Sequence, residues 1–141
     1  MSKVAIVYWS GTGNTAKMAD AVEEGVKSAG AEAVVVNPAD FTADSVAEYH
    51  GIAFGCAAMG AEQLEETEYQ PMWDDVRGAL SGKKVGLFGS YGWGDGEWMR
   101  TWEERVNNAG ASLVTESVIC NDAPDDEAIE ACKALGAAFS D

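Results

Sequence analysis

Near its N-terminus the chain reads Trp9-Ser10-Gly11-Thr12-Gly13-Asn14-Thr15, and the fold prediction starts from these residues. This stretch follows an apolar run, Val4-Ala5-Ile6-Val7-Tyr8, which predicts a buried parallel strand. It precedes an amphipathic pattern that predicts a helix. The apolar residues of that pattern are Met18, Ala21, Val22, Val26 and Ala29. The quoted stretch is therefore a tight turn between a strand and a helix.

This turn has the composition of an anion site. The first N–H groups of a helix have no partner within the helix, and the positive end of the helix dipole lies there. Gly11 and Gly13 let the backbone approach a ligand closely. The side-chain donors of the turn are Ser10, Thr12, Asn14 and Thr15. We interpret the turn as a phosphate cradle, with a helix-capping turn that binds no ligand as the alternative.

The type of phosphate follows from the side chains. The segment 11–16 satisfies the dinucleotide fingerprint G-x-G-x-x-G/A, which is a weak signal alone. It lacks the Lys-Ser or Lys-Thr pair of a P-loop. A pyrophosphate that passes a helix end needs bare glycine, whereas a terminal phosphate monoester exposes three oxygens to donors. A turn with three hydroxyls and an amide therefore favours a monoester.

Length and composition indicate one domain that spans residues 1–141. No apolar run approaches the length of a membrane span, and no signal peptide precedes the first strand, so we expect a cytoplasmic protein. The three cysteines, Cys56, Cys120 and Cys132, lack metal-site spacing and are expected to be reduced. His50 is the single histidine, which disfavours a histidine-based metal or catalytic site.

The net charge is −15, from 24 acidic and 9 basic residues. A surface with this charge repels nucleic acid and anionic membranes. It is compatible with basic protein partners that long-range attraction steers. A surface that serves only solubility is the other interpretation.

Strand and helix patterns alternate along the chain and predict an α/β fold with a parallel sheet and helices on both faces. Strand patterns cover residues 3–8, 32–37, 51–58, 84–90 and 112–120. Helix patterns cover residues 14–29, 71–80, 97–108 and 124–139, with a short helix expected within 40–49 and a solvated loop over 59–70. Ligands of such sheets bind beyond the carboxyl ends of the strands.

Two further loops follow predicted strands at that edge. The segment 90–98 carries Trp93 between glycines, where few neighbours bury it, so its ring is suited to stacking on a flat ligand. Met59 follows another strand and offers a polarisable thioether. A flat ring system joined to a terminal phosphate would fill both this slot and the phosphate cradle.

With these motifs the chain resembles a short-chain flavodoxin over nearly its whole length. The matching segments are Tyr8-Trp9-Ser10-Gly11-Thr12-Gly13-Asn14-Thr15, Ala58-Met59-Gly60 and Gly89-Ser90-Tyr91-Gly92-Trp93-Gly94-Asp95-Gly96. The resemblance implies a flavodoxin-like three-layer sandwich with a five-stranded sheet of order 2-1-3-4-5, for which flavodoxin is a standard example. It also implies FMN, bound without a covalent link.

The resemblance assigns a role to each motif. Ser10, Gly11, Thr12, Gly13, Asn14 and Thr15 would hold the phosphate. Met59 and Trp93 would enclose the flavin ring, and the Glu62 carboxylate would accept a hydrogen bond from its N3–H. The remaining pocket residues are Ala58, Gly60, Ala61, Ser90, Tyr91, Gly92, Gly94 and Asn121. Ala57 and Ala61 depart from the pattern, because close relatives carry serine and aspartate there.

The function implied is that of an electron carrier without a substrate of its own. It would transfer single electrons at low potential between redox enzymes. The expected partners are ferredoxin- or flavodoxin-linked oxidoreductases that dock through basic patches, and the carrier is expected to be a monomer. A flavin reductase is the main alternative. A receiver domain would need an aspartate where Ala57 and Ala58 stand, and a phosphatase of similar topology would need a cysteine and an arginine in the first loop.

Overall fold

The computed structural model describes residues 3–9, 13–56, 69–91, 97–121 and 124–140. The strands are β1 (Lys3–Trp9), β2 (Glu32–Val36), β3 (Gly51–Cys56), β4 (Lys84–Tyr91), β5 (Ser112–Leu113) and β6 (Val118–Asn121). The α-helices are α1 (Asn14–Ser28), α2 (Ala43–Val46), α3 (Tyr69–Val76), α4 (Glu97–Asn108) and α5 (Asp126–Ala137). Short 3-10 helices cover Pro38–Asp40, Arg77–Ala79 and Ala138–Ser140.

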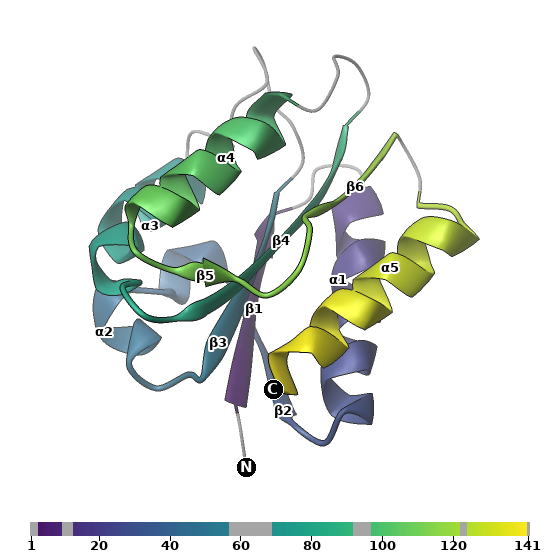
Figure 1. Ribbon diagram of the computed structural model, residues 1–141, viewed down its shortest axis with the longest axis horizontal. Coiled ribbons are helices and arrows are strands. Elements are labelled where there is room, and N and C mark those ends of the chain that lie inside the picture. The colour runs from purple at the N-terminus through teal and green to yellow at the C-terminus, as the bar shows by residue number, and fades with distance from the viewer. Residues whose placement is uncertain (1–2, 10–12, 57–68, 92–96, 122–123, 141) are drawn as a thin grey trace.

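The strands form one sheet of order β2-β1-β3-β4-β5, with β6 also paired to β4 (Figure 1). Each pairing is parallel. In the centre of the sheet β1 lies between β2 and β3, so that Ile6 pairs with Val35 on one side and Ala53 on the other. The predicted strand order and the helices on both faces are therefore confirmed.

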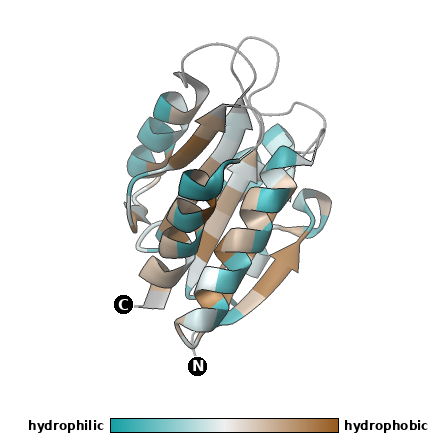
Figure 2. Cartoon of the chain, turned by 90° about the vertical axis from the view of Figure 1, so that its right-hand side faces the viewer, coloured by the Kyte–Doolittle hydropathy of each residue, from teal (hydrophilic) through white to brown (hydrophobic). Residues whose placement is uncertain are grey.

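Helices cover both faces of the sheet and give the fold two cores (Figure 1). Side chains alternate along β1, so that Val4 and Ile6 pack with α1 and α5 while Ala5 and Val7 pack with α2, α3 and α4. Figure 2 shows hydrophilic residues on the outward faces of α1 and α5, with the hydrophobic strands behind them. This three-layer arrangement buries apolar side chains on both sides of the central strands.

Helices α1 and α5 approach each other through glycine. A Cβ atom on Gly25 of α1 would overlap the carbonyl oxygen of Lys133, and one on Gly136 of α5 would overlap that of Val22. The two backbones can pack this closely only because neither position carries a side chain. The packing ties together the two helices that flank β1 on this face.

The core beneath α3 and α4 is aromatic. Trp73 and Trp102 are buried and pack edge to face, with ring centroids 5.9 Å apart. Phe54 packs edge to face against Trp73, and Tyr69 packs edge to face against Trp102. Trp73 lies on α3 and Trp102 on α4, so both helices contribute a tryptophan to this core. The side chain of Trp98 lies outside the described residues.

The prediction of one continuous strand over residues 112–120 is wrong. Strand β5 pairs Leu113 with Val85, whereas β6 pairs Val118 with Phe88. On β4, two residues lie between Val85 and Phe88. On the edge, four residues lie between their partners Leu113 and Val118, so the edge carries two extra residues. The insertion forms a bulge over residues 114–117 and divides the strand in two.

The other differences concern element ends. Helix α3 begins at Tyr69 rather than Pro71, because Tyr69 is buried and belongs to the helix, where a solvated loop had been predicted. Helix α2 covers Ala43–Val46 within the expected 40–49 segment. Helix α4 has the predicted bounds, and α1 ends one residue before the prediction. Among the described helices, none is both long and apolar enough to cross a membrane.

Candidate functional site

The carboxyl edge of the sheet gathers the ends of four strands. Trp9 at the end of β1 pairs with Cys56 at the end of β3, and Tyr91 at the end of β4 pairs with Asn121 at the end of β6. The segments that follow these four strands are distant in sequence, but they begin close together at this edge (Figure 1). This is the position at which open parallel sheets bind ligands.

The N-terminus of α1 lies at the same edge. Its N-cap is Gly13, which has a φ of 92° and so occupies the left-handed region that favours glycine. The first turn contains no acidic residue, and the glycine cap has no side chain to accept a hydrogen bond from the helix. The N–H groups that begin a helix therefore meet no carboxylate from the described residues of this turn.

A buried pair of hydroxyls joins this helix end to β4. The Oγ1 of Thr15 lies 3.2 Å from the Oγ of Ser90, and either oxygen can be the donor. Thr15 is fully buried and Ser90 is 5% exposed. The hydrogen bond connects the second residue of α1 to the next-to-last residue of β4, and so links the predicted phosphate motif to the strand that leads into the Trp93 segment.

Tyr69 anchors the start of α3 beneath the site. Its hydroxyl donates a 2.6 Å hydrogen bond to the carbonyl oxygen of Val7. Burial raises the pKa of this hydroxyl well above its ordinary value, and the nearby Cys56 thiol adds to the effect. The phenol therefore stays protonated and keeps its donor role. Both residues that flank the segment 57–68 thus lie against β1, because Cys56 is in register with Trp9 and Tyr69 is hydrogen-bonded to Val7.

Tyr69 is a structural anchor that was not predicted from the sequence. A detectable signal was present, because Tyr69, Met72, Trp73 and Val76 have the i, i+3, i+4, i+7 spacing of a helix face. The acidic residues that precede this group had suggested a solvated loop up to residue 70. The Thr15–Ser90 hydrogen bond had no local signal, since 75 positions separate the two residues.

The predicted pocket residues fall into two sets. The structure brings Gly13, Asn14, Thr15, Ser90, Tyr91 and Asn121 to the carboxyl edge, the last two described by their backbone. The others lie outside the described residues. They are Ser10, Gly11, Thr12, Ala58, Met59, Gly60, Ala61, Glu62, Gly92, Trp93 and Gly94.

The described part of the chain offers little other chemistry at this edge. It contains no group of three histidine, cysteine, aspartate or glutamate side chains placed to hold a metal ion. Cys56, Cys120 and Cys132, all within the described residues, are not joined by disulfide bonds. Burial raises the pKa of Cys132 to about 12, with a further contribution from Cys120, so Cys132 stays protonated at neutral pH.

Comparison with known proteins agrees with this geometry. A family model described as Flavodoxin matches residues 6–136. The chain is 48% identical to a flavodoxin of Megasphaera elsdenii over 135 residues, which cover 96% of each protein. It is 46% identical to a flavodoxin of Clostridium beijerinckii over 131 residues, which cover 93% of this chain and 94% of the relative.

The chain belongs to the flavodoxin family.

Solved structures of the family have the same architecture. The solution structure of two-electron reduced Megasphaera elsdenii flavodoxin superposes with a TM-score of 0.88 at 50% identity, and covers 97% of this chain and 98% of its own. A flavodoxin from the domain Archaea superposes with a TM-score of 0.84 at 28% identity. Flavodoxins bind FMN and transfer electrons. This chain is therefore an FMN-binding electron-transfer protein of that family.

Proposed function

We propose that this flavodoxin carries single electrons at low potential between redox enzymes, on FMN bound at the carboxyl edge of its sheet. The observation that carries the proposal is the N-terminus of α1. It combines a left-handed glycine cap, a first turn without acidic residues and a buried hydroxyl pair at one edge of the sheet. These features suit the phosphate end of FMN, and FMN supplies the redox chemistry when it is bound.

The Thr15–Ser90 hydroxyl pair suits a phosphate, because one direction of its hydrogen bond leaves the Thr15 proton available to a phosphate oxygen. A threonine hydroxyl has one proton to donate and two lone pairs that accept. When the Thr15 hydroxyl donates to a phosphate oxygen, its proton is not available to Ser90. The Ser90 hydroxyl must then donate to Thr15 Oγ1 across the 3.2 Å contact. Ser90 would in this way orient the Thr15 proton toward the anion.

The remaining phosphate contacts are proposed for Ser10, Gly11, Thr12, Gly13 and Asn14. Met59 and Trp93 are proposed to enclose the flavin ring. Residues 58–62, 91–94 and 121 are proposed to complete the pocket around its polar edge. Support comes from the described strand ends, because β3, β4 and β6 lead directly into these segments at one edge of the sheet.

The low potential follows from charge. The chain carries a net charge of −15. Adding negative charge to a bound group near like charges costs free energy, so reduction to an anionic form is disfavoured. The protein's role is to position the cofactor, exclude water from one side and set this electrostatic environment.

The same charge suits partners with basic docking surfaces. We propose that these are ferredoxin- or flavodoxin-linked oxidoreductases, that the carrier acts as a cytoplasmic monomer, and that it has no substrate of its own. Attraction between oppositely charged surfaces raises the rate of encounter and falls as salt screens it beyond about 10 Å at 0.1 M.

An absorbance spectrum with a cofactor titration tests this function. We expect a yellow protein that binds one FMN per chain, with tryptophan fluorescence quenched on binding. Incubation of the loaded protein with NADPH alone is expected to give no sustained oxidation. A colourless protein that does not take up added FMN would contradict the proposal, and steady NADPH oxidation would identify a reductase instead.

A further inference from the structure

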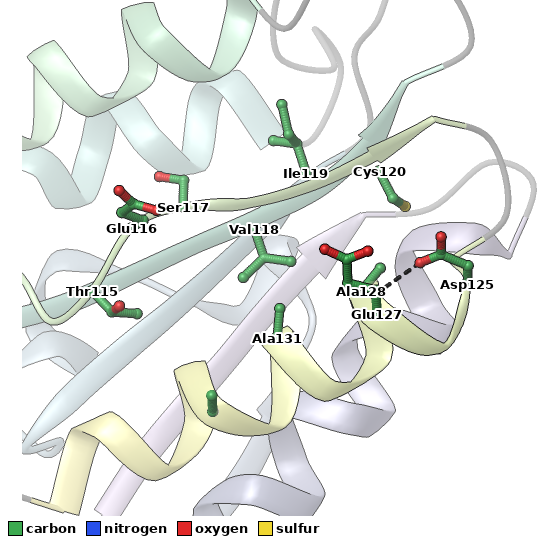
Figure 3. Close-up of a pocket in the computed structure, with 11 residues that line it drawn as sticks. Thr115, Glu116, Ser117, Val118, Ile119, Cys120, Asp125, Glu127, Ala128 and Ala131 are labelled. Atoms are coloured by element: carbon green, nitrogen blue, oxygen red, sulfur yellow. Dashed lines mark hydrogen bonds between the residues drawn. The ribbon is translucent and has the colours of Figure 1, made fainter.

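A groove lies along the free edge of the sheet, and none of its lining residues is a proposed cofactor ligand. It has a volume of about 540 Å³ and runs between residues 115–120 and α5 (Figure 3). Its floor is apolar, because Val118 of β6 and Ala131 of α5 point toward one another and Ala128 lies beside them. We call this hollow the edge groove.

The two extra residues of the edge shape this groove. Residues 114–117 bulge between β5 and β6, so the edge does not continue as one straight strand. Glu116 in the bulge and Glu127 in the first turn of α5 are both exposed and line the groove. The bulge therefore places one carboxylate on the strand side of the apolar floor, and α5 supplies another on the helix side.

Strand β6 lies at an edge of the sheet, which is where a further strand can add. Among the described strands, β6 pairs with β4 alone. In a parallel pair, alternate residues direct their N–H and C=O groups away from the partner strand. Proteins commonly protect such an edge with lysine, proline or a covering segment. Here the side chain of Ile119 is 38% exposed, and the groove lining contains no lysine or arginine.

The charge of the lining indicates what fits there. Three carboxylates line the groove, from Glu116, Asp125 and Glu127. Asp125 also caps α5, through a 2.9 Å hydrogen bond from the Ala128 N–H. An apolar floor bordered by carboxylates suits a side chain with an apolar stem and a cationic end. Lysine and arginine have this form, because their methylene groups cover apolar surface while the charge stays in water.

We propose that the edge groove binds an extended, lysine- or arginine-bearing segment of a redox partner, which adds as a strand beside β6. Alternate side chains of that segment would lie over the α5 side of the sheet, with their stems on Ala131 and their charges near Glu116 and Glu127. Strand β6 ends at Asn121 on the carboxyl edge, so the groove would hold the partner beside the cofactor site. The choice of a redox enzyme as the partner rests on the proposed function.

A second copy of this chain is a weaker occupant. Each copy carries a net charge of −15, and pairing two edge grooves would bring carboxylates against carboxylates. The sheet has another free edge at β2, where Val35 is 48% exposed. The edge groove contains no residue of that edge, so β2 is an internal comparison for the binding experiment.

The test uses the FMN-loaded full chain, labelled with nitrogen-15, and a synthetic octapeptide in which lysine alternates with valine and threonine. We expect amide shift changes that are confined to residues 116–120 and 127–131, with an affinity that weakens as salt is added. Shift changes at β2, or changes spread over the whole acidic surface, would overturn the proposal. Concentration-dependent dimerisation of the chain through β6 would also overturn it.

Matched substitutions distinguish binding in the edge groove from attraction to the overall negative charge. Glu127→Gln and Glu116→Gln are each expected to weaken peptide binding about two- to fivefold, which is typical for one exposed ion pair. Glu130→Gln is the control, because Glu130 lies on the same helix but pairs with Lys133 at 3.7 Å and does not line the groove. Equal weakening by all three variants would show that the peptide follows net charge and not the groove.

A second peptide tests strand addition. Replacing its valines by proline keeps the lysines and removes backbone N–H donors. We expect this peptide to bind at least about fivefold more weakly than the first, because strand pairing would be lost. Equal binding of the two peptides would exclude addition to β6. None of these readouts uses electron transfer, so their failure would leave the proposed function standing.

Discussion

The two helices that flank β1 begin in opposite ways. Helix α5 begins at Asp125, whose carboxylate accepts a hydrogen bond from the Ala128 N–H, and its first turn carries two more acidic residues. Helix α1 begins at Gly13, and its first turn carries none. Both helices start at the carboxyl edge of one sheet and pack against each other along their length (Figure 1). Their different beginnings are therefore not a consequence of their place in the fold.

The comparison shows how one edge can hold a single anion site. At α5 the carboxylates already satisfy the positive end of the helix dipole, and they would repel an added phosphate. At α1 the described turn supplies a glycine and the Thr15 hydroxyl, which complement an anion instead of replacing it. Under the proposed function, this difference directs the FMN phosphate to the start of α1 and not to the start of α5.

The largest expected effect is the difference between FMN and riboflavin. Riboflavin lacks the phosphate and leaves the N-terminus of α1 without its anion. Charge-assisted hydrogen bonds contribute about 1.5–3 kcal/mol each. We therefore expect riboflavin to bind at least about 3 kcal/mol more weakly, or roughly a hundredfold, by fluorescence titration. Equal affinities would show that α1 differs from α5 for some reason other than phosphate binding.

The next largest effect should come from making α1 resemble α5. Asn14→Asp puts a carboxylate in the first turn of α1, where it would repel the phosphate and weaken FMN binding by about 1.4 kcal/mol, or tenfold. The same carboxylate interacts favourably with the positive end of the helix dipole. The free energy of unfolding of the FMN-free protein should therefore rise by about 0.3–1 kcal/mol. Urea denaturation and FMN titration measure the two effects.

Two controls accompany this substitution. Asn14→Ala removes the amide without adding charge, and Glu127→Gln changes the charge at the start of α5. FMN affinity should fall less in the first control than in Asn14→Asp, and it should not fall in the second. If Asn14→Asp and Asn14→Ala were equal in both measurements, repulsion at α1 would be refuted.

Removing the N-cap of α5 should lower the stability of the protein without changing its affinity for FMN. Asp125→Ala removes the N-cap acceptor of α5 and should cost about 1 kcal/mol of unfolding free energy, within a usual range of about 0.5–2. Riboflavin and FMN affinities should both stay unchanged. Asp125→Asn keeps an acceptor at the cap and should cost much less. A loss of FMN affinity in Asp125→Ala would mean that the two helix ends are not independent.

The smallest effect concerns the hydroxyl pair. Thr15→Ala and Ser90→Ala should each weaken FMN binding, and the double variant should weaken it by less than their sum. The coupling should be about 0.5–1 kcal/mol for FMN and near zero for riboflavin, because Ser90 acts on the phosphate only through Thr15. If Thr15→Ala matters and Ser90→Ala does not, the phosphate site stands and the proposed proton direction fails.

Local patterns were sufficient for most of the fold. The apolar run before Trp9 and the helix face after Asn14 predicted the strand and the helix that the structure contains, and α4 has the bounds that its pattern predicted. Alternation of such units leads to a parallel sheet, because parallel strands require crossover connections. Family resemblance supplied the strand order and FMN, which periodicity alone does not specify.

Tertiary structure decided the features that depend on contacts between distant residues. The division of the last strand appears only in its register on β4, since the bulge residues carry no distinct signal of their own. Tyr69 becomes a buried anchor because β1 presents the Val7 carbonyl to it. Thr15 and Ser90 meet because β1 and β4 end at one edge of a sheet in which β3 lies between them. Sequence determines which groups a segment can offer, whereas only the folded chain determines which group meets which, since hydrogen bonds and packing depend on distance in space.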